Sequence, residues 1–284
     1  MTVQVWGVTM VRDEQDVIEQ TLRHLHAEGL DGVVVLENRS ADDTPAILAR
    51  LKRELFAPDG EAAWLVVVED PEPGYWQSAK MTAAARTAGG LGATWVIPFD
   101  ADEIWYDPAG RRLAEAVPIL GNEASIVTAE LYDHRCTALD PEMPADVDDP
   151  FTRMGWRHTD PLPLPKVAVR VKGLHAIHPG NHGATYLGTE TSPAASGLHV
   201  RHFPYRSAEQ FVRKARNGAE AYAATTLPRG TGQHWREYGE TLAVHGPEAL
   251  EQHYTHHFTF AHPAEAGLIF DPAPLRVEPS VSPS

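Results

Sequence analysis

The chain has little of what marks several common protein classes. It contains one cysteine, Cys136, among 284 residues, so an internal disulfide is excluded and a reducing cytoplasm is the expected compartment. No apolar run reaches the roughly 20 residues that cross a bilayer, and the first residues form a strand-like run instead of a secretory leader. Basic residues are also few, because 24 Lys and Arg stand against 39 Asp and Glu. The resulting net charge of −15 disfavours nucleic-acid partners, and we expect no integral membrane contact.

Two familiar nucleotide-binding loops are missing as well. Neither a Walker A motif nor a Rossmann glycine fingerprint occurs, and residues 8–14, which end the first expected strand, contain no glycine. A phosphate-bearing ligand would therefore need another device to hold it. That device would be a metal ion, a helix N-terminus or a few clustered basic side chains.

What is present is a regular alternation of strand and helix signals over the first hundred residues. This pattern predicts an α/β fold with a parallel sheet covered by helices on both faces. Asp13 and Thr44 are the expected N-caps of the first two helices, and Ser207 is expected to begin a late helix with a capping box to Gln210. The expected strands are 3–11, 32–37, 64–68, 94–99, 125–132 and 167–171, and a third helix is expected over 77–88.

The pattern loosens after residue 107, and a long turn-rich stretch over 139–165 predicts an acceptor lid. We expect one main domain over 1–225, divided into a donor-binding half, 1–107, and an acceptor half, 108–225. A helical extension over 226–270 and a disordered tail over 271–284 are expected to follow.

An acidic motif, Asp100-Ala101-Asp102, stands directly after the fourth expected strand, where ligands gather in open α/β sheets. Carboxylates separated by one residue project to the same side of an extended segment, so these two can address one cation. Oxygen ligands select Mg²⁺ or Mn²⁺, and such ions complete their shell with phosphates and water. A solvated acidic turn is the alternative interpretation of the motif.

Four phrases together resemble family 2 glycosyltransferases, in the branch related to family 92. They are similar to that family in order and spacing, and they cover roughly residues 3–225. Asp13 stands where the branch has asparagine, and Asn38 stands where the family has the acidic residue that contacts the nucleotide base. The phrases are Val8–Glu14, Glu37–Thr44, Phe99–Glu103 and His202–Ser207.

The resemblance implies a GT-A fold: a Rossmann-like, mostly parallel central sheet flanked by helices, with a looser acceptor side. It implies a Mn²⁺- or Mg²⁺-dependent glycosyltransferase that moves a sugar with inversion, from a nucleotide-sugar donor to a soluble small-molecule, peptide or saccharide acceptor. A UDP-sugar is the favoured donor. Asp102 leads the implied metal ligands, with Asp100 and His202 completing the set. The implied donor contacts are Val11, Arg12, Glu14, Asn38, Ser40, Lys80, Asp100, Ala101, Arg206 and Lys214.

Inversion requires a base for the acceptor proton, and Asp160, in the expected lid, is favoured over Asp133 and Glu190. Asp102 and Asp160 are thus the catalytic candidates. The pair His178 and His182 is placed on the acceptor side, although such a turn also uses histidine to bond the backbone. Other candidates have ordinary structural interpretations: Trp76 and Trp105 for stacking, and Arg213 and Arg216 for a basic helix start.

Two other classes of function fit parts of this pattern. A Mg²⁺-dependent phosphohydrolase or nucleotidyltransferase also uses Asp at strand ends. A dehalogenase-type phosphatase, however, carries its Asp-x-Asp on the first strand, and a sugar nucleotidyltransferase needs a Gly-rich loop there. A non-catalytic nucleotide-sugar-binding protein would keep the donor affinity without metal-dependent turnover.

Overall fold

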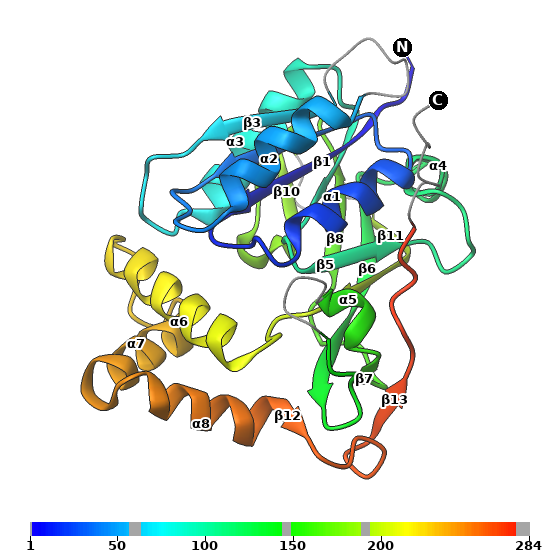
Figure 1. The fold of residues 1–284 in the computed structure, drawn as a ribbon. Coiled ribbons are helices and arrows are strands. Elements are labelled where there is room, and N and C mark those ends of the chain that lie inside the picture. Colours follow the sequence, from blue (N-terminus) through cyan, green and yellow to red (C-terminus); the bar gives the residue numbers. More distant parts are fainter. Residues whose placement is uncertain (1, 57–63, 144–148, 189–193, 277–284) are drawn as a thin grey trace.

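The computed structural model describes residues 2–56, 64–143, 149–188 and 194–276. Figure 1 shows a central sheet with helices on both faces and a separate group of three helices beside one edge. The expected α/β fold, a central sheet with a parallel core flanked by helices, is confirmed.

The parallel core of the sheet has the strand order β3-β2-β1-β4, and β8, β6, β7 and β13 continue it beyond β4. Strand β8 runs antiparallel to both β4 and β6, whereas β11 pairs parallel to β6 and antiparallel to β5. The strands are β1 (Val5–Val11), β2 (Gly32–Glu37), β3 (Leu65–Glu69), β4 (Trp95–Pro98), β5 (Glu103–Tyr106), β6 (Ile126–Thr137), β7 (Trp156–His158), β8 (Lys166–Arg170), β9 (Leu174–Ile177), β10 (Ala184–Tyr186), β11 (Ala194–His202), β12 (Thr259–Phe260) and β13 (Leu268–Phe270).

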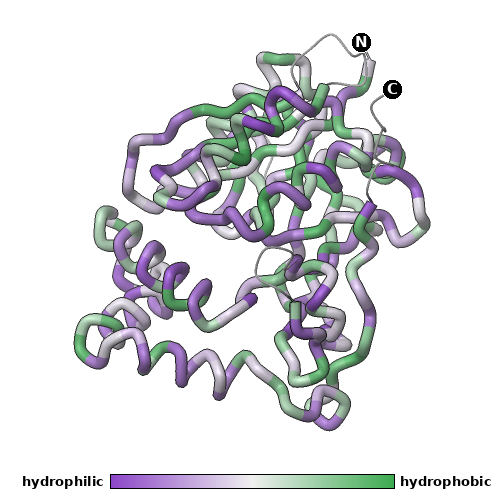
Figure 2. The backbone as a smooth tube through the Cα atoms, in the orientation of Figure 1, coloured by the Kyte–Doolittle hydropathy of each residue, from purple (hydrophilic) through white to green (hydrophobic). Residues whose placement is uncertain are grey.

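Helices cover the two faces of the sheet unequally. Helix α3, which is rich in alanine, packs against β1, β2 and β9 on one face, while α1, α2 and α4 belong to the larger apolar core on the other. Figure 2 shows hydrophobic stretches along the central strands and hydrophilic stretches along outward loops. The helices are α1 (Ile18–Ala27), α2 (Thr44–Glu54), α3 (Gln77–Gly90), α4 (Leu113–Leu120), α5 (Pro150–Arg153), the 3-10 turn η1 (Pro179–Asn181), α6 (Ala208–Ala223), α7 (Gln233–His245) and α8 (Pro247–Phe258).

The parallel core buries both faces of its strands, as parallel sheets require. Val33 and Val35 of β2 belong to one apolar cluster, and Val34 between them belongs to the other. Strand β2 contains Gly32 because Trp6 lies across it: a Cβ at Gly32 would be 2.7 Å from the Trp6 ring. The close β1–β2 pairing therefore depends on a residue without a side chain.

Helices α6, α7 and α8 pack on one another and stand beside the carboxyl ends of the parallel strands (Figure 1). Helix α6 connects this group to the sheet. Arg12 at the end of β1 pairs with Glu220 of α6 at 2.8 Å, and Asn217 of the same helix donates to Asp13 at 2.7 Å. Helices α6, α7 and α8 therefore cover the carboxyl ends of the parallel strands, where the ligand was expected.

The capping predictions had mixed outcomes. Ser207 caps α6, because its side chain accepts from the Gln210 backbone amide at 3.1 Å, whereas the Gln210 side chain accepts from the Arg206 amide instead of completing a box with Ser207. The expected caps at Asp13 and Thr44 are wrong. Asp13 lies five residues before the start of α1, has a positive φ of 57° and accepts from the Ala41 amide. Thr44 lies inside α2 and accepts from the Glu14 amide, so both side chains tie one loop to another.

Other predicted segments differ in detail. Within the stretch expected as a lid, the described residues form the short helix α5 and the strand β7, so that stretch is not a continuous loop. Residues 277–284 of the expected tail lie outside the described residues. In the described part of that tail, Asp271 pairs with Arg157 at 2.6 Å and with Arg201 at 2.7 Å. No helix in the described ranges is long and apolar enough to span a membrane.

Candidate functional site

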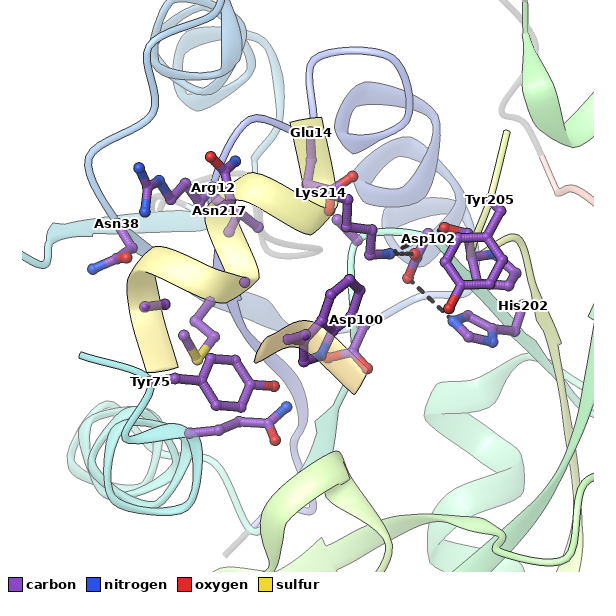
Figure 3. A pocket seen from close by; sticks show the side chains of 18 of the residues that line it. Arg12, Glu14, Asn38, Tyr75, Asp100, Asp102, His202, Tyr205, Lys214 and Asn217 are labelled. Carbon is purple, nitrogen blue, oxygen red and sulfur yellow. Dashed lines mark hydrogen bonds and ion pairs between the residues drawn. The ribbon is translucent and has the colours of Figure 1, made fainter. Parts of the chain in front are cut away.

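A cavity of about 480 Å³ opens at the carboxyl ends of β1, β2 and β4, beneath α6 and α7. This volume lies within the range of roughly 300–1,000 Å³ that small-molecule sites occupy. Figure 3 shows Arg12 and Asn38 toward one end of it, and Asp102, Lys214 and His202 toward the other. Of the predicted donor and metal residues, those lining it are Val11, Arg12, Glu14, Asn38, Asp100, Ala101, Asp102, His202 and Lys214.

Asp102 is the electrostatic centre of one end of the cavity (Figure 3). Lys214 of α6 lies 2.5 Å from its Oδ2, Arg206 lies 3.4 Å from the same oxygen, and Nε2 of His202 lies 3.6 Å from its Oδ1. Burial alone would raise the pKa of Asp102, but the charges of Lys214, His202 and Arg206 outweigh it and lower that pKa. The carboxylate is therefore ionised, and the positively charged side chains around it stabilise its negative charge.

His202, at the end of β11, is oriented by a second carboxylate. Its Nδ1 lies 2.7 Å from Asp133 of β6, and Asp133 also pairs with Arg135 at 2.9 Å. A carboxylate that accepts from one ring nitrogen fixes the imidazole, so the other nitrogen faces Asp102. Asp133 is committed to this contact and does not line the cavity.

Asp100 has different partners. It pairs with Lys166 of β8 at 2.7 Å and accepts from the Asn181 amide at 3.2 Å. Lys166 also lies 2.6 Å from the buried Glu103. Burial raises the pKa of Glu103 to about 7, with Asp100 adding to the rise and Lys166 opposing it. Lys166 is thus shared between two carboxylates whose charges it partly neutralises.

The sequence analysis expected an extended segment around Asp100 and Asp102, and the structure has a turn there. Ala101 and Asp102 form a turn between β4 and β5. The two carboxylates therefore have separate partners, with Lys166 and Asn181 around Asp100 and Lys214 and His202 around Asp102.

Asn38, at the other end, is held by the segment after β3. Its amide nitrogen donates to the Asp70 carbonyl and carboxylate at 3.0 Å each and to the Glu72 carbonyl at 2.7 Å. Acceptors surround the position, so asparagine fits where an aspartate would be repelled. The amide oxygen of Asn38 is the atom that this arrangement leaves for a ligand.

Aromatic side chains also line the cavity. Tyr75 stands before α3 and faces Tyr222 of α6, with 4.8 Å between ring centroids. Trp235 of α7 also lines the cavity. The tryptophans proposed for stacking do not: Trp105 is fully buried and donates to Glu103, and Trp76 is absent from the lining. Position in the sequence alone did not distinguish the buried aromatic rings from those that line the cavity.

Three predicted donor contacts do not line the cavity. Arg206 is buried, and its guanidinium binds Glu14 at 2.6 Å and Asp16 at 2.7 Å in addition to Asp102. Lys80 pairs with Asp70 at 2.7 Å, and Ser40 accepts from the Asp13 amide at 3.0 Å. Each of these groups holds a loop in place. Arg206 stands outside the lining because carboxylates that are distant in the sequence surround its guanidinium.

The structure also distinguishes the candidates for the catalytic base by whether they line the cavity. Asp160 is exposed and does not line the cavity, and Glu190 lies outside the described residues. Of the histidine pair, His178 is exposed whereas His182 lines the cavity. The basic residues Arg213 and Arg216 also stand outside the lining, and Arg213 lies 3.8 Å from Asp16.

The sequence analysis missed Lys166, which lines the cavity, and Asn181, which is buried behind the lining and donates to Asp100. Lys166 precedes an apolar strand, a position typical of an ordinary strand edge, and its partners are more than sixty residues away. Asn181 gave a stronger signal, because it stands in the phrase His-Pro-Gly-Asn-His-Gly. It is buried with a positive φ of 60°, a conformation that asparagine tolerates better than most residues.

Within the described ranges, no group of three or more His, Cys, Asp or Glu side chains converges in a way that could hold a metal ion. The pair formed by Asp102 and His202 supplies one oxygen and one nitrogen ligand, with His202 anchored on Asp133. Mg²⁺ and Mn²⁺ commonly take one or two protein ligands and complete the shell with substrate phosphates and water. The residues present therefore fit a cation that arrives together with a phosphate ligand.

No protein-family model matches the chain, and no curated protein matches it. Solved structures with a similar fold include S. aureus TarS 1-349 in complex with UDP, at 12% identity and a TM-score of 0.38, covering 86% of this chain and 73% of that one. Glucosyl-3-phosphoglycerate synthase from Mycobacterium tuberculosis, in complex with Mn²⁺, UDP and phosphoglyceric acid, has 18% identity and a TM-score of 0.30, covering 45% and 43%. A 4-diphosphocytidyl-2C-methyl-D-erythritol synthase has 15% identity and a TM-score of 0.34, covering 62% and 78%. At these scores the function must be argued from the site itself.

Proposed function

We propose that the protein is a glycosyltransferase that takes its sugar from a nucleotide-sugar donor, with a UDP-sugar as the first candidate. The observation that carries this proposal is the arrangement of chemical groups from one end of the cavity to the other. One end offers an amide oxygen, the other end offers a lysine and a histidine around one carboxylate, and aromatic rings also line the cavity. A nucleoside diphosphate has the complementary order of groups.

The nucleotide base would lie at the end formed by Asn38 and Arg12. Because the Asn38 amide nitrogen is bonded to Asp70 and Glu72, its oxygen would accept from the ligand. Uracil and guanine present a ring N–H for such a contact. Tyr75 and Tyr222 line the cavity nearby and offer faces for stacking.

The diphosphate would lie at the Asp102 end. Lys214 lines the cavity and is a quarter exposed, so it can leave Asp102 and pair with a phosphate. Asp102 and His202 would hold a Mn²⁺ or Mg²⁺ ion. When bound, that ion supplies Lewis-acid stabilisation for the charge on the departing diphosphate. Asp100, bonded to Lys166 and Asn181, receives no metal in this proposal and shapes the sugar-binding region.

The acceptor would lie on the side of the cavity that Lys166 and His182 line. Leu162 and Leu131 line the cavity next to Lys166 and His182, which gives this part a mixed polar and apolar wall. We propose a small-molecule, peptide or saccharide acceptor with a hydroxyl group. A direct displacement with inversion needs one base near the sugar and no protein nucleophile.

The end of β1 argues against the phosphohydrolase alternative. A dehalogenase-type enzyme needs a free carboxylate nucleophile there, but Asp13 accepts from the Ala41 amide and from Asn217. Analysis of the products separates the classes. UDP-glucose incubated with Mn²⁺ and the protein should give UDP and glucose. Release of inorganic phosphate, or of UMP with glucose 1-phosphate, would instead assign a hydrolase that attacks the phosphates.

A further inference from the structure

His182 stands in a turn that the rest of the fold holds firmly. The turn follows η1 and joins β9 to β10. Gln77 of α3 accepts from the Gly180 amide at 2.6 Å, and the His178 amide donates to the Gly183 carbonyl at 2.8 Å. Asn181, fully buried beside His182, donates to Asp100 at 3.2 Å. The imidazole is therefore presented to the cavity from a fixed backbone beside the acidic motif.

A single hydrogen bond defines the tautomer of its neutral ring. Nδ1 of His182 lies 2.9 Å from the Pro165 carbonyl oxygen. A carbonyl can only accept, so Nδ1 carries the hydrogen and Nε2 of the neutral ring keeps an unshared electron pair. Gly180 keeps that nitrogen uncovered, because a Cβ at Gly180 would lie 2.5 Å from Nε2. Gly180 has a φ of 73°, which also favours glycine.

The carboxylates that line the cavity are committed to other contacts. Glu14 pairs with Arg206, Asp100 with Lys166, and Asp102 with Lys214. His202 bonds Asp133 and faces Asp102. Another lining histidine, His234 of α7, packs against Trp235 and Tyr238.

The charges around His182 favour its neutral form. Burial lowers the pKa of the ring, and the positive charges of Lys166 and His202 lower it further. The Pro165 hydrogen bond and the carboxylate of Asp100 oppose this shift. A neutral imidazole near pH 7 can accept a proton, and the nearby Asp100 would stabilise the cation that forms.

We propose that Nε2 of His182 is the general base that takes the proton from the acceptor hydroxyl, an inference that rests on the proposed glycosyltransferase function. The acceptor oxygen forms a bond to the anomeric carbon as its O–H bond breaks. The bond between that carbon and the diphosphate oxygen breaks with its electron pair, and the nucleoside diphosphate leaves. His182 then loses the proton to solvent.

The test uses the His182→Asn variant of the full chain. The asparagine amide can still donate to Pro165, but no atom replaces Nε2. With UDP-glucose, Mn²⁺ and water as the acceptor, UDP release should fall by about 10²- to 10⁴-fold, the usual contribution of general base catalysis. The acidic limb of the wild-type pH profile should disappear, while the Kd for UDP stays within about threefold because the ring does not bind the nucleotide. The control His245→Asn, at an exposed histidine of α7 outside the cavity, should keep both the rate and the limb.

The possible failures are distinguishable. A His182→Asn variant that binds UDP and keeps the wild-type rate and acidic limb overturns the base assignment and leaves the glycosyltransferase function standing. A wild-type protein that binds neither UDP nor GDP contradicts the function itself. Two-bond ¹H–¹⁵N NMR of histidine-labelled protein tests the ring without turnover. Near pH 7.5 the His182 signals, assigned by their loss in the variant, should show hydrogen on Nδ1. Hydrogen on Nε2 would refute the proposal.

Discussion

Nζ of Lys214 lies 2.5 Å from Oδ2 of Asp102, the carboxylate that the proposed cation would share with His202. Lysine and cation therefore compete for one carboxylate when the donor is absent. A diphosphate would relieve the competition, because it accepts the lysine on one side and a metal ion on the other. Donor and metal should bind cooperatively for this reason.

The Lys214→Met variant tests this competition. Removing the ammonium group should tighten the binding of Mn²⁺ alone by at least about threefold and weaken UDP binding with Mn²⁺ present by at least about tenfold, a loss of about 1.4 kcal/mol. Isothermal titration calorimetry measures both constants. Arg213→Met, one residue earlier on α6 and outside the cavity, is the matched control and should change neither by more than about twofold. Weaker Mn²⁺ binding in Lys214→Met would refute the competition.

Arg206 should matter for stability more than for ligand binding. Its buried guanidinium joins Glu14, Asp16 and Asp102. Removing one partner of a buried ion network leaves the others uncompensated, so Arg206→Met should lower the free energy of unfolding by about 3–5 kcal/mol. Urea denaturation monitored by tryptophan fluorescence measures the loss. A variant that unfolds like the wild type but fails to bind UDP would instead restore Arg206 as a phosphate contact.

The surroundings of Asn38 explain why this position is not acidic. Asn38→Asp would place a carboxylate 3.0 Å from that of Asp70 and would remove the donor that three acceptors use. We expect the free energy of unfolding to fall by about 1–3 kcal/mol, the usual cost of leaving buried polar groups unpaired. Adding Asp70→Asn should recover at least half of this loss. A stable Asn38→Asp protein that binds UDP more tightly would contradict this explanation.

Stability should fall with acid because of His24. The Trp105 carbonyl accepts from Nε2 at 2.7 Å and Nδ1 accepts from the Arg276 amide at 2.9 Å, so the neutral ring is fully bonded. Burial lowers the pKa of His24 from 6.5 to about 4. The unfolded chain therefore binds a proton that the folded chain excludes between these values, and stability is lost as the pH falls through them.

The size of this loss follows from linkage. By pH 4 the contribution of His24 should approach about 3 kcal/mol, at about 1.4 kcal/mol per pKa unit. Urea denaturation at pH 7.5 and pH 4.5 should show a smaller acid loss for His24→Gln than for the wild type. The exposed His245 of α7 offers the control substitution His245→Gln. If all three proteins lost the same free energy of unfolding between pH 7.5 and pH 4.5, His24 would not be the group responsible.

Local signals predicted the parallel core and the α6 cap well. The bounds of β2 agree with the expected ones, and Ser207 caps α6 through a contact three residues away. Such features depend on neighbouring residues and on apolar patterns, which a sequence displays directly. The Asp13 and Thr44 predictions failed because both side chains bond a distant loop, a choice that the tertiary structure makes.

The site was predicted less completely, for a related reason. Asp102, His202 and Lys214 were expected in one place and do meet. Lys166 was missed, because nothing near it in the sequence distinguishes it from a lysine at a strand edge. Arg206 stands next to Ser207, where basic residues are typical of phosphate sites, yet carboxylates from the far end of the chain surround it. Ion pairs between residues that are far apart in the sequence decide which charged side chains remain available to a ligand.

The most direct test of the proposed donor site is calorimetric titration of UDP and GDP, with and without Mn²⁺, into the wild type and Asp102→Asn. We expect one nucleotide to bind, its affinity to rise with Mn²⁺, and Asp102→Asn to lose most of that rise while remaining folded. If neither nucleotide binds the wild type, or if the affinity is the same without Mn²⁺ and in the variant, the cavity does not hold a metal–diphosphate group as proposed.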